Sequence, residues 1–357
     1  MRKLIGGDGI FLNAMALALA LVAASGCSTE QRPASVTCVN PVYAGDMPDP
    51  SVKKFGDEYY AFGTTGDARL PDGRIFTVLR SRDLAHWERL GGALIPPFTN
   101  ADYQYWAPEI TANDGKYYLY YAMGDDQPEH FMIRVGVSDR PGGPFRDSGA
   151  VLADCSTNRF TIDPFPFRDD DGQWYLFDAC DFPYDSPGFH AGTGIEVNRL
   201  LNMTTPGRDC RVVVRPAFDW TLYQAHRRMD AFHRTFSAWH TIEGPCVVKH
   251  HGKYYCFYSG SNWRTPRYGV DYVVAEHPLG PYTGAGNHAR ALHSVPGKVF
   301  GPGGISIVTG PDGKTQYVIY HAWDRGMTRR QMCVDKLEWT ADGPRCTPTV
   351  TPQRINQ

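Results

Sequence analysis

Four acidic residues stand at similar places in this sequence, each shortly before a glycine that leads into an aromatic run. They are Asp49, Glu109, Asp163 and Glu243, which precede Gly56, Gly115, Gly172 and Gly252 by six to nine residues. Two carboxyl groups can hydrolyse an acetal, since one protonates the leaving oxygen while the other activates water. An aspartate beside proline is also a common turn residue, so any single one has a structural explanation. Four together favour a chemical role, because a buried carboxylate without a partner is costly.

The acidic residues open copies of one repeated unit. In each copy a short strand leads through a glycine turn into a second strand rich in Tyr and Phe, the pattern of a β-hairpin. A fifth copy, Gly303–Tyr320, has no acid at this place. The turn glycines 56, 115, 172, 252 and 313 are spaced by 59, 57, 80 and 61 residues.

Strand-only repeats of this length predict an all-β fold, a five-bladed β-propeller formed by residues 40–357 as a single catalytic domain. The first strand of each propeller blade lines the central channel, so the carboxylates should meet at one mouth of that channel. The composition agrees, with 37 glycines and 27 prolines for turns and 46 aromatic residues for packing between blades. Charge is nearly balanced, at 36 basic and 38 acidic residues, which argues against a nucleic-acid partner.

Residues 1–27 have the pattern of an export signal. Arg2 and Lys3 precede an apolar stretch, Phe11–Ala24, that is short for a membrane span. The stretch ends in Ala24-Ser25-Gly26-Cys27, which resembles a bacterial lipobox, so we expect a lipid anchor on Cys27 and a tether over residues 28–39. An ordinary secretory signal cut nearby is the alternative. Either reading predicts an exported protein, and the lipobox places it on a bacterial membrane, facing the periplasm or the cell surface.

Eight cysteines follow Cys27, and export places them in an oxidising compartment. Cys246 and Cys256 flank one hairpin turn, and Cys333 and Cys346 flank another. We expect these two pairs to form disulfide bonds, although eight cysteines allow 105 pairings. The sequence has no C-x-x-C motif, which argues against a redox or zinc site built on cysteines.

A series of short motifs between residues 40 and 350 resembles glycoside hydrolase family 43, in the order found in that family. The motifs are Asn40-Pro41 with Gly45-Asp46-Met47-Pro48-Asp49-Pro50-Ser51, Trp106-Ala107-Pro108-Glu109-Ile110, Ile162-Asp163-Pro164 with Asp170-Asp171-Gly172, Glu243-Gly244-Pro245, and Gly301-Pro302-Gly303 with Thr309-Gly310-Pro311-Asp312-Gly313.

The resemblance implies an inverting glycosidase on a five-bladed propeller. Asp49 would be the general base that activates water, and Glu243 the general acid. Asp163 would hold Glu243 in place and raise its pKa, as a neighbouring carboxylate does. Inversion needs room for a water, so the carboxyl groups of Asp49 and Glu243 should lie roughly 6.5–9.5 Å apart. Glu109 would shape the substrate pocket.

Other residues have weaker assignments. Trp106 could stack on a sugar or could pack beside its strand. Relatives place an arginine near the substrate, which points to Arg329 or Arg330, and Arg330 is the one we name. The resemblance also implies that His321 points into the channel and binds a structural Ca²⁺ or other cation, directly or through water. A buried histidine without a ligand is the alternative, and the chemistry itself requires no cofactor.

Family resemblance implies a substrate among the pentose-containing plant polysaccharides and their oligosaccharides. We favour an exo-acting α-L-arabinofuranosidase over a β-xylosidase and an endo-α-1,5-arabinanase. The long interval between the third and fourth turns supplies a loop segment, Phe182–Trp239, that would close one side of the pocket and favour exo action. A different class is a non-catalytic glycan-binding surface lipoprotein, but the presence of all three expected carboxylates argues against it.

Overall fold

The five turn glycines each close a β-hairpin, as the sequence predicts. The computed structural model describes residues 35–65, 68–98, 102–125, 130–153 and 160–357. In it Gly56, Gly115, Gly172, Gly252 and Gly313 all have positive φ, which glycine adopts without steric cost. The export signal, the lipobox and tether residues 28–34 lie outside the described residues, and Pro33–Gln357 forms one compact unit.

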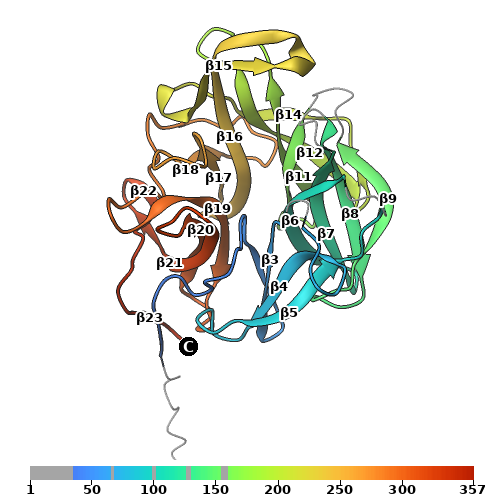
Figure 1. Cartoon of the computed structure of the whole chain (residues 1–357), viewed down its shortest axis with the longest axis vertical. Coiled ribbons are helices and arrows are strands. Elements are labelled where there is room, and N and C mark those ends of the chain that lie inside the picture. Colours follow the sequence, from blue (N-terminus) through green and yellow to red (C-terminus); the bar gives the residue numbers. More distant parts are fainter. Residues whose placement is uncertain (1–34, 66–67, 99–101, 126–129, 154–159) are drawn as a thin grey trace, which may run out of the picture. The chain divides into compact units, whose positions relative to one another are not determined.

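Each hairpin is the inner half of one propeller blade, and the expected five-bladed fold is confirmed (Figure 1). Blade 1 consists of β2 (Ser51–Phe55), β3 (Glu58–Gly63), β4 (Ile75–Ser81) and β5 (Glu88–Leu94). Blade 2 consists of β6 (Gln104–Asn113), β7 (Lys116–Gly124), β8 (Met132–Ser138) and β9 (Arg146–Ala153). Blade 5 consists of β19 (Phe300–Thr309), β20 (Gln316–Trp323), β21 (Arg330–Thr340) and β22 (Gly343–Cys346). The strands of blades 3 and 4 are β10 (Thr161–Arg168), β11 (Trp174–Phe182), β12 (Gly192–Asn202), β13 (Thr205–Pro206) and β14 (Arg211–Val214); and β16 (Arg234–His250), β17 (Lys253–Gly260) and β18 (Gly269–Ala275).

The segment expected to be a long loop is largely strand. Strands β12 to β14 complete blade 3, and two 3₁₀ turns, η2 (Asp219–Thr221) and η3 (Asp230–Phe232), flank strand β15 (Leu222–Met229). Strand β15 pairs with the first half of β16 and forms a hairpin beyond blade 4, which we call the β15–β16 hairpin. Strand β16 also pairs in parallel with β12, Gly192 opposite His240, so blades 3 and 4 share one continuous sheet.

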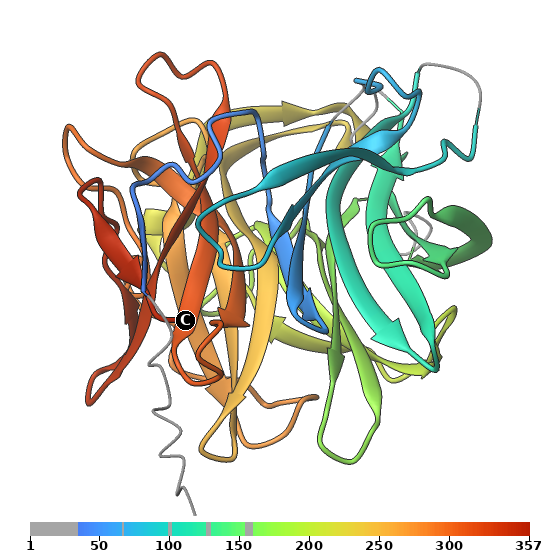
Figure 2. The same cartoon turned by 90° about the horizontal axis from the view of Figure 1, so that it is seen from below.

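The two ends of the described chain close the ring. Strand β1 (Val36–Cys38) pairs with β23 (Gln353–Ile355), and Tyr43 exchanges backbone hydrogen bonds with Met332 of blade 5. Blue and red segments accordingly lie side by side in Figure 2. The expected tether over residues 28–39 is therefore too long, because residues 36–38 belong to a strand and Cys38 is buried.

Aromatic residues of the second strands fill the space between blades. Tyr59, Tyr120, Phe177, Tyr258 and Tyr320 are all fully buried or nearly so. Their large apolar area stabilises the contact of each sheet with its neighbours, because burial removes that area from water. No helix among the described residues is long and apolar enough to cross a membrane.

The expected disulfide bonds are wrong for this structure. Cys246 and Cys256 are free, and the register places Cys246 opposite Phe257 and Cys256 opposite Val247. Because adjacent strand residues point to opposite faces, the two thiols lie on different sides of the sheet. Cys333 and Cys346 are free as well: Cys346 pairs with Leu337, four residues along β21 from Cys333, which is about 13 Å at the usual rise and too far for a bridge.

One residue with left-handed backbone stands at the same place at the inner strand of every blade. In blades 2 to 5 it lies in a β-bulge, where the pairing of the first two strands shifts register, and in blade 1 it stands two residues before the start of β2. The five residues are Asp49, Ala107, Asp163, Gly244 and Gly304, with φ of 51°, 43°, 56°, 62° and 55°. A proline follows the first four of them. We call these the channel bulges.

Candidate active site

Relative to the channel bulges, the four acidic residues do not occupy equivalent positions. Asp49 and Asp163 are themselves bulge residues, whereas Glu243 comes one residue before the bulge of blade 4 and Glu109 comes two residues after that of blade 2. The structure therefore brings Asp49, Asp163 and Glu243 to one cavity, whereas Glu109 lines only a narrower cavity in the channel. The similar spacing to the turn glycines had concealed this offset.

Asp49 is held by three neighbours. Thr64 donates a hydrogen bond to its Oδ2 at 2.8 Å, Arg330 Nη1 lies 3.2 Å from its Oδ1, and its backbone N–H donates to His321 Nδ1 at 3.1 Å. Burial by itself would raise the pKa of Asp49, but the charge of Arg330 and the Thr64 hydroxyl outweigh it and hold that pKa below its ordinary value. Asp49 is therefore an ionised carboxylate at neutral pH.

Glu243 has the opposite protonation tendency. Burial raises its pKa to about 7, and the negative charge of Asp49 raises it too, although the Tyr268 hydroxyl donates to Glu243 Oε1 at 2.7 Å and opposes this. A carboxyl group with a pKa near 7 can donate a proton at neutral pH. The Tyr268 ring also stacks on His321, with ring centroids 5.9 Å apart. Tyr268 therefore contacts both Glu243 and the histidine that accepts the backbone N–H of Asp49.

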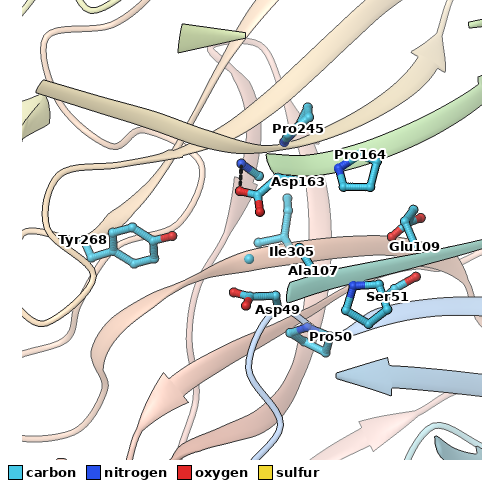
Figure 3. Close-up of a pocket in the computed structure, with 13 residues that line it drawn as sticks. Asp49, Pro50, Ser51, Ala107, Glu109, Asp163, Pro164, Pro245, Tyr268 and Ile305 are labelled. Carbon is cyan, nitrogen blue, oxygen red and sulfur yellow. Dashed lines mark hydrogen bonds between the residues drawn. The ribbon is translucent and has the colours of Figure 1, made fainter. Parts of the chain in front are cut away.

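Asp163 is the third carboxyl group of the site, and its pKa is raised, as that of Glu243 is. Its Oδ2 accepts the backbone N–H of Gly244 at 2.8 Å, the dashed line in Figure 3. Burial raises the pKa of Asp163 well above its ordinary value, and the charges of Glu243 and Asp49 raise it further. Asp163 and Glu243 therefore titrate as a pair that retains a proton near neutral pH, because two adjacent buried carboxyl groups resist double ionisation.

The three carboxyl groups line an open cavity of about 560 Å³. Seven of its fifteen other lining residues are aromatic or cationic: Trp106, Phe160, Tyr223 and Trp263, with Arg227, Arg264 and Arg330. A narrower cavity of about 40 Å³ lies in the channel, where Asp49, Asp163 and Tyr268 appear together (Figure 3). Aromatic faces with a few fixed polar groups are typical of a site for a small polar ligand.

Trp106 and Arg330 lie where the sequence placed them, in the lining of the larger cavity. Trp106 also packs on Phe131, with ring centroids 3.9 Å apart, so one side of its ring is covered by protein. Arg330 reaches from Asp49 to Trp263, whose ring centroid lies 4.8 Å from the guanidinium carbon. Arg329 instead lies 3.9 Å from Asp324 in an exposed position, which resolves the choice between the two arginines.

Glu109 does not line the larger cavity but lines the narrower one, together with Asp49 and Asp163. Its role in shaping the substrate pocket stays a prediction. Glu109 is buried in the channel and pairs with Lys53 Nζ at 3.0 Å, and Lys53 also lies over the Phe165 ring of blade 3. In Figure 3 it lies on the far side of the cavity from Tyr268. The pair therefore links the inner strands of blades 1 and 2.

His321 is fully buried, and the hydrogen bonds of its ring nitrogens determine whether it can bind the expected cation directly. Burial lowers its pKa to about 3, so the ring is neutral. Its Nδ1 accepts the Asp49 N–H, which places the remaining ring proton on Nε2, and Nε2 has no partner among the described residues. A protonated Nε2 donates to water or oxygen and cannot ligate a metal, so the cation near His321 stays a prediction that fits only through water.

The sequence analysis missed several residues that complete the site. Thr64 and Tyr268 bind the two carboxyl groups directly, and Trp263, Tyr223 and Arg227 line the cavity. Thr64 could have been found from the repeat of the blades. It directly follows the second strand of blade 1, at the position equivalent to Ser259 in blade 4 and His321 in blade 5. Tyr268 precedes β18 and had no such signal.

Known proteins share this fold. The family model described as glycosyl hydrolases family 43 matches residues 38–344, so the chain belongs to glycosyl hydrolase family 43. It is an inverting glycoside hydrolase, and members of this family need no cofactor for catalysis.

Individual relatives are similar along most of the chain. A β-D-galactofuranosidase of Aspergillus niger is 25% identical, over 85% of this chain and 83% of that protein. An extracellular exo-α-(1→5)-L-arabinofuranosidase of Streptomyces avermitilis is 24% identical, over 92% of this chain and 66% of that protein. A solved thermostable family-43 glycoside hydrolase is 29% identical with a TM-score of 0.75, over 90% of this chain and 99% of that one.

The opposed protonation of Asp49 and Glu243 predicts a bell-shaped pH profile of kcat/KM. The active form has Asp49 ionised and Glu243 protonated, so activity rises as pH passes the depressed pKa of Asp49 and falls through about pH 7. Asp163→Asn removes the carboxyl group that titrates together with Glu243 and should move the alkaline limb to lower pH. Asp170→Asn, an exposed site, is the matched control and should leave the limb in place. An alkaline limb that stays or moves upward in Asp163→Asn would contradict the coupling.

Proposed function

We propose that the protein is an exo-acting α-L-arabinofuranosidase, with Asp49 as general base and Glu243 as general acid. The observation that carries these roles is the opposed pKa shift of two carboxyl groups lining one cavity. Asp49 accepts a proton from water as that water attacks the anomeric carbon, and Glu243 gives its proton to the leaving oxygen. Asp163 keeps Glu243 protonated until then.

The other cavity residues position the sugar. Arg330 holds the Asp49 carboxylate in one orientation from 3.2 Å, and the exposed side of Trp106 and the ring of Trp263 offer apolar faces to a sugar ring. None of these groups needs to form a bond with the substrate. These groups hold the sugar in the orientation that a single displacement reaction requires.

Two observations support exo action on an arabinofuranoside. Tyr223 and Arg227 of the β15–β16 hairpin line the cavity together with Asp49 and Thr64 of blade 1, and these added side chains reduce the room for a long chain. Several similar proteins are named for furanosides, including the Streptomyces and Aspergillus enzymes. Others are named β-xylosidase or endo-α-(1→5)-L-arabinanase, which keeps these two activities as the alternatives on the same site.

Substrate release separates these activities. We expect the highest kcat/KM on an aryl α-L-arabinofuranoside, lower values on aryl β-D-xyloside and β-D-galactofuranoside, and little release from linear debranched arabinan. Arabinose release is measured by chromatography, with Asp49→Asn as the blank. Faster action on linear arabinan than on all aryl glycosides would overturn the exo assignment. Tight glycan binding by a wild-type protein with no turnover would identify the non-catalytic alternative.

Leaving-group dependence tests the acid role. We expect Glu243→Gln to lose on the order of 10²–10⁴-fold in kcat on an alkyl arabinofuranoside, whose leaving group needs a proton, and much less on a dinitrophenyl one. Asp49→Asn should lose activity equally on both, because water activation is needed whatever the leaving group. Circular dichroism and Tm confirm folding. A Glu243→Gln variant that keeps near-wild-type rates on the alkyl substrate would remove Glu243 from the acid role.

We also propose that the mature protein is lipid-anchored on Cys27 to a bacterial membrane. The support is Ala24-Ser25-Gly26-Cys27 after the apolar stretch, so that cleavage leaves Cys27 at the N-terminus. Metabolic labelling with a palmitate analogue should mark the wild-type protein and not Cys27→Ser, and the wild type should sediment with membranes. An unlabelled, soluble secreted wild type would indicate an ordinary signal peptide.

A further inference from the structure

Three potential metal ligands meet at the base of the β15–β16 hairpin. One ligand atom each of His190, Asp219 and His240 lies within 4.8 Å of the other two, the one such grouping found among the described residues. They come from separate segments: His190 precedes β12, Asp219 opens η2, and His240 is in β16 opposite Leu222 of β15. None of them lines the substrate cavity, and the proposed reaction uses none of them.

Backbone contacts hold the two histidines in place. His190 N–H donates to Pro216 O at 2.8 Å, and His240 N–H donates to Ala191 O at 3.1 Å. Gly192 lies opposite His240, and a Cβ at Gly192 would overlap the His240 carbonyl oxygen, so the close approach of β12 and β16 requires glycine there. The spacing of the two imidazoles is therefore built into the sheet that joins blades 3 and 4.

The hydrogen bonds of His240 leave one ring nitrogen available. Thr221 Oγ1 donates to Phe218 O at 2.8 Å, so toward His240 Nδ1, 3.0 Å away, it can only accept. His240 Nδ1 therefore carries the ring proton, and Nε2 keeps its lone pair. Metal-bound histidines are commonly oriented by such a bond from the other ring nitrogen.

His190 and Asp219 are the two proposed ligands whose side chains are free to rotate. The two imidazole rings stack with centroids 4.2 Å apart and planes 11° apart, and His190 Nε2 lies 3.7 Å from Asp219 Oδ1. Stacked rings cannot both direct in-plane lone pairs at one ion, so the His190 ring must turn. The side chains of His190 and Asp219 are 40% and 97% exposed, which leaves them free to rotate toward a buried and fixed His240.

We propose that His190, His240 and Asp219 form a binding site for a zinc-class transition-metal ion, with water completing the coordination. Two imidazoles and one carboxylate match the ligands that Zn²⁺ takes at about 2.0–2.2 Å. Calcium and magnesium prefer oxygen ligands throughout and are not expected here.

An ion at this site would tie the β15–β16 hairpin to the sheet next to the substrate cavity. Tyr223 follows η2 by two residues and Thr241 follows His240 directly, and both line the cavity. A ligand that binds only the folded protein stabilises it by mass action. The bound ion therefore raises Tm and fixes the hairpin that carries Tyr223 and Arg227.

Calorimetric titration of the untagged, chelator-treated protein with ZnCl₂ tests the site. We expect one equivalent of Zn²⁺ to bind, with Ca²⁺ giving no signal at the same concentration. His190→Ala and Asp219→Asn should each raise Kd on the order of tenfold or more, and both keep buried His240 so that folding is preserved. His288→Ala, an exposed histidine beside Asn287, is the matched control and should bind as the wild type does.

A thermal scan supplies the second readout. Zn²⁺ should raise Tm of the wild type and of His288→Ala but not of His190→Ala. Absence of stoichiometric binding overturns the proposal and leaves only a stacked pair of imidazole rings. Binding of equal strength in His190→Ala and Asp219→Asn places the ion elsewhere and overturns it too. Because neither readout uses a glycoside, failure here is distinct from failure of the arabinofuranosidase assignment.

Discussion

The structure depends on one repeated interaction, the hydrogen bond from a channel bulge N–H to a side chain of the neighbouring blade or strand. A left-handed residue turns its N–H away from its own hairpin, and a buried N–H without an acceptor would be costly. The acceptors are His321 for Asp49, Thr64 for Ala107, Asp163 for Gly244 and Ser259 for Gly304. The same contacts that join neighbouring blades therefore also orient the carboxyl groups, so ring assembly and site assembly are a single event.

This arrangement explains how neighbouring carboxyl groups acquire different protonation states. Thr64 and Arg330 stabilise charge on Asp49, whereas Glu243 and Asp163 share a buried region with few compensating donors. The difference comes from blade position: Arg330 begins β21 beside blade 1 and is closest to Asp49. A ring of similar strands thus supplies dissimilar environments, because each bulge meets a different neighbour.

Much of the fold was readable from the sequence because its signals are local. A glycine turn followed by aromatic residues specifies a hairpin without knowledge of the rest, and five copies specify the ring. The positions of Asp49, Asp163 and Glu243 followed from these hairpins. Cys333 and Cys346 are four residues out of register, which is too far for a bridge. The offset of Glu109 and the unpaired Cys246 and Cys256 share another cause: an extra bulge residue or a one-residue register change reverses the face to which a side chain points. Spacing to a turn glycine does not record that change. Tyr268 depends on a contact between loops and strands far apart in sequence, which no local pattern reveals.

The left-handed backbone of the channel bulges also limits which residues evolution can use there. Glycine, asparagine and aspartate adopt this conformation most readily, and other residues incur on the order of 1–3 kcal/mol of strain. Asp49 and Asp163 satisfy the backbone and supply a carboxylate at once, while Glu243, one residue earlier and outside the bulge, is free to be the longer acid. Exchange of Asp49 for glutamate would thus violate a conformational requirement as well as a distance. In blade 4 the equivalent position is Gly244, where a Cβ would meet its neighbours at ordinary contact distance, so a new acid could arise there by substitution to aspartate. In blade 5 a Cβ at Gly304 would lie within 3 Å of His321 and Asp49, so only glycine fits there.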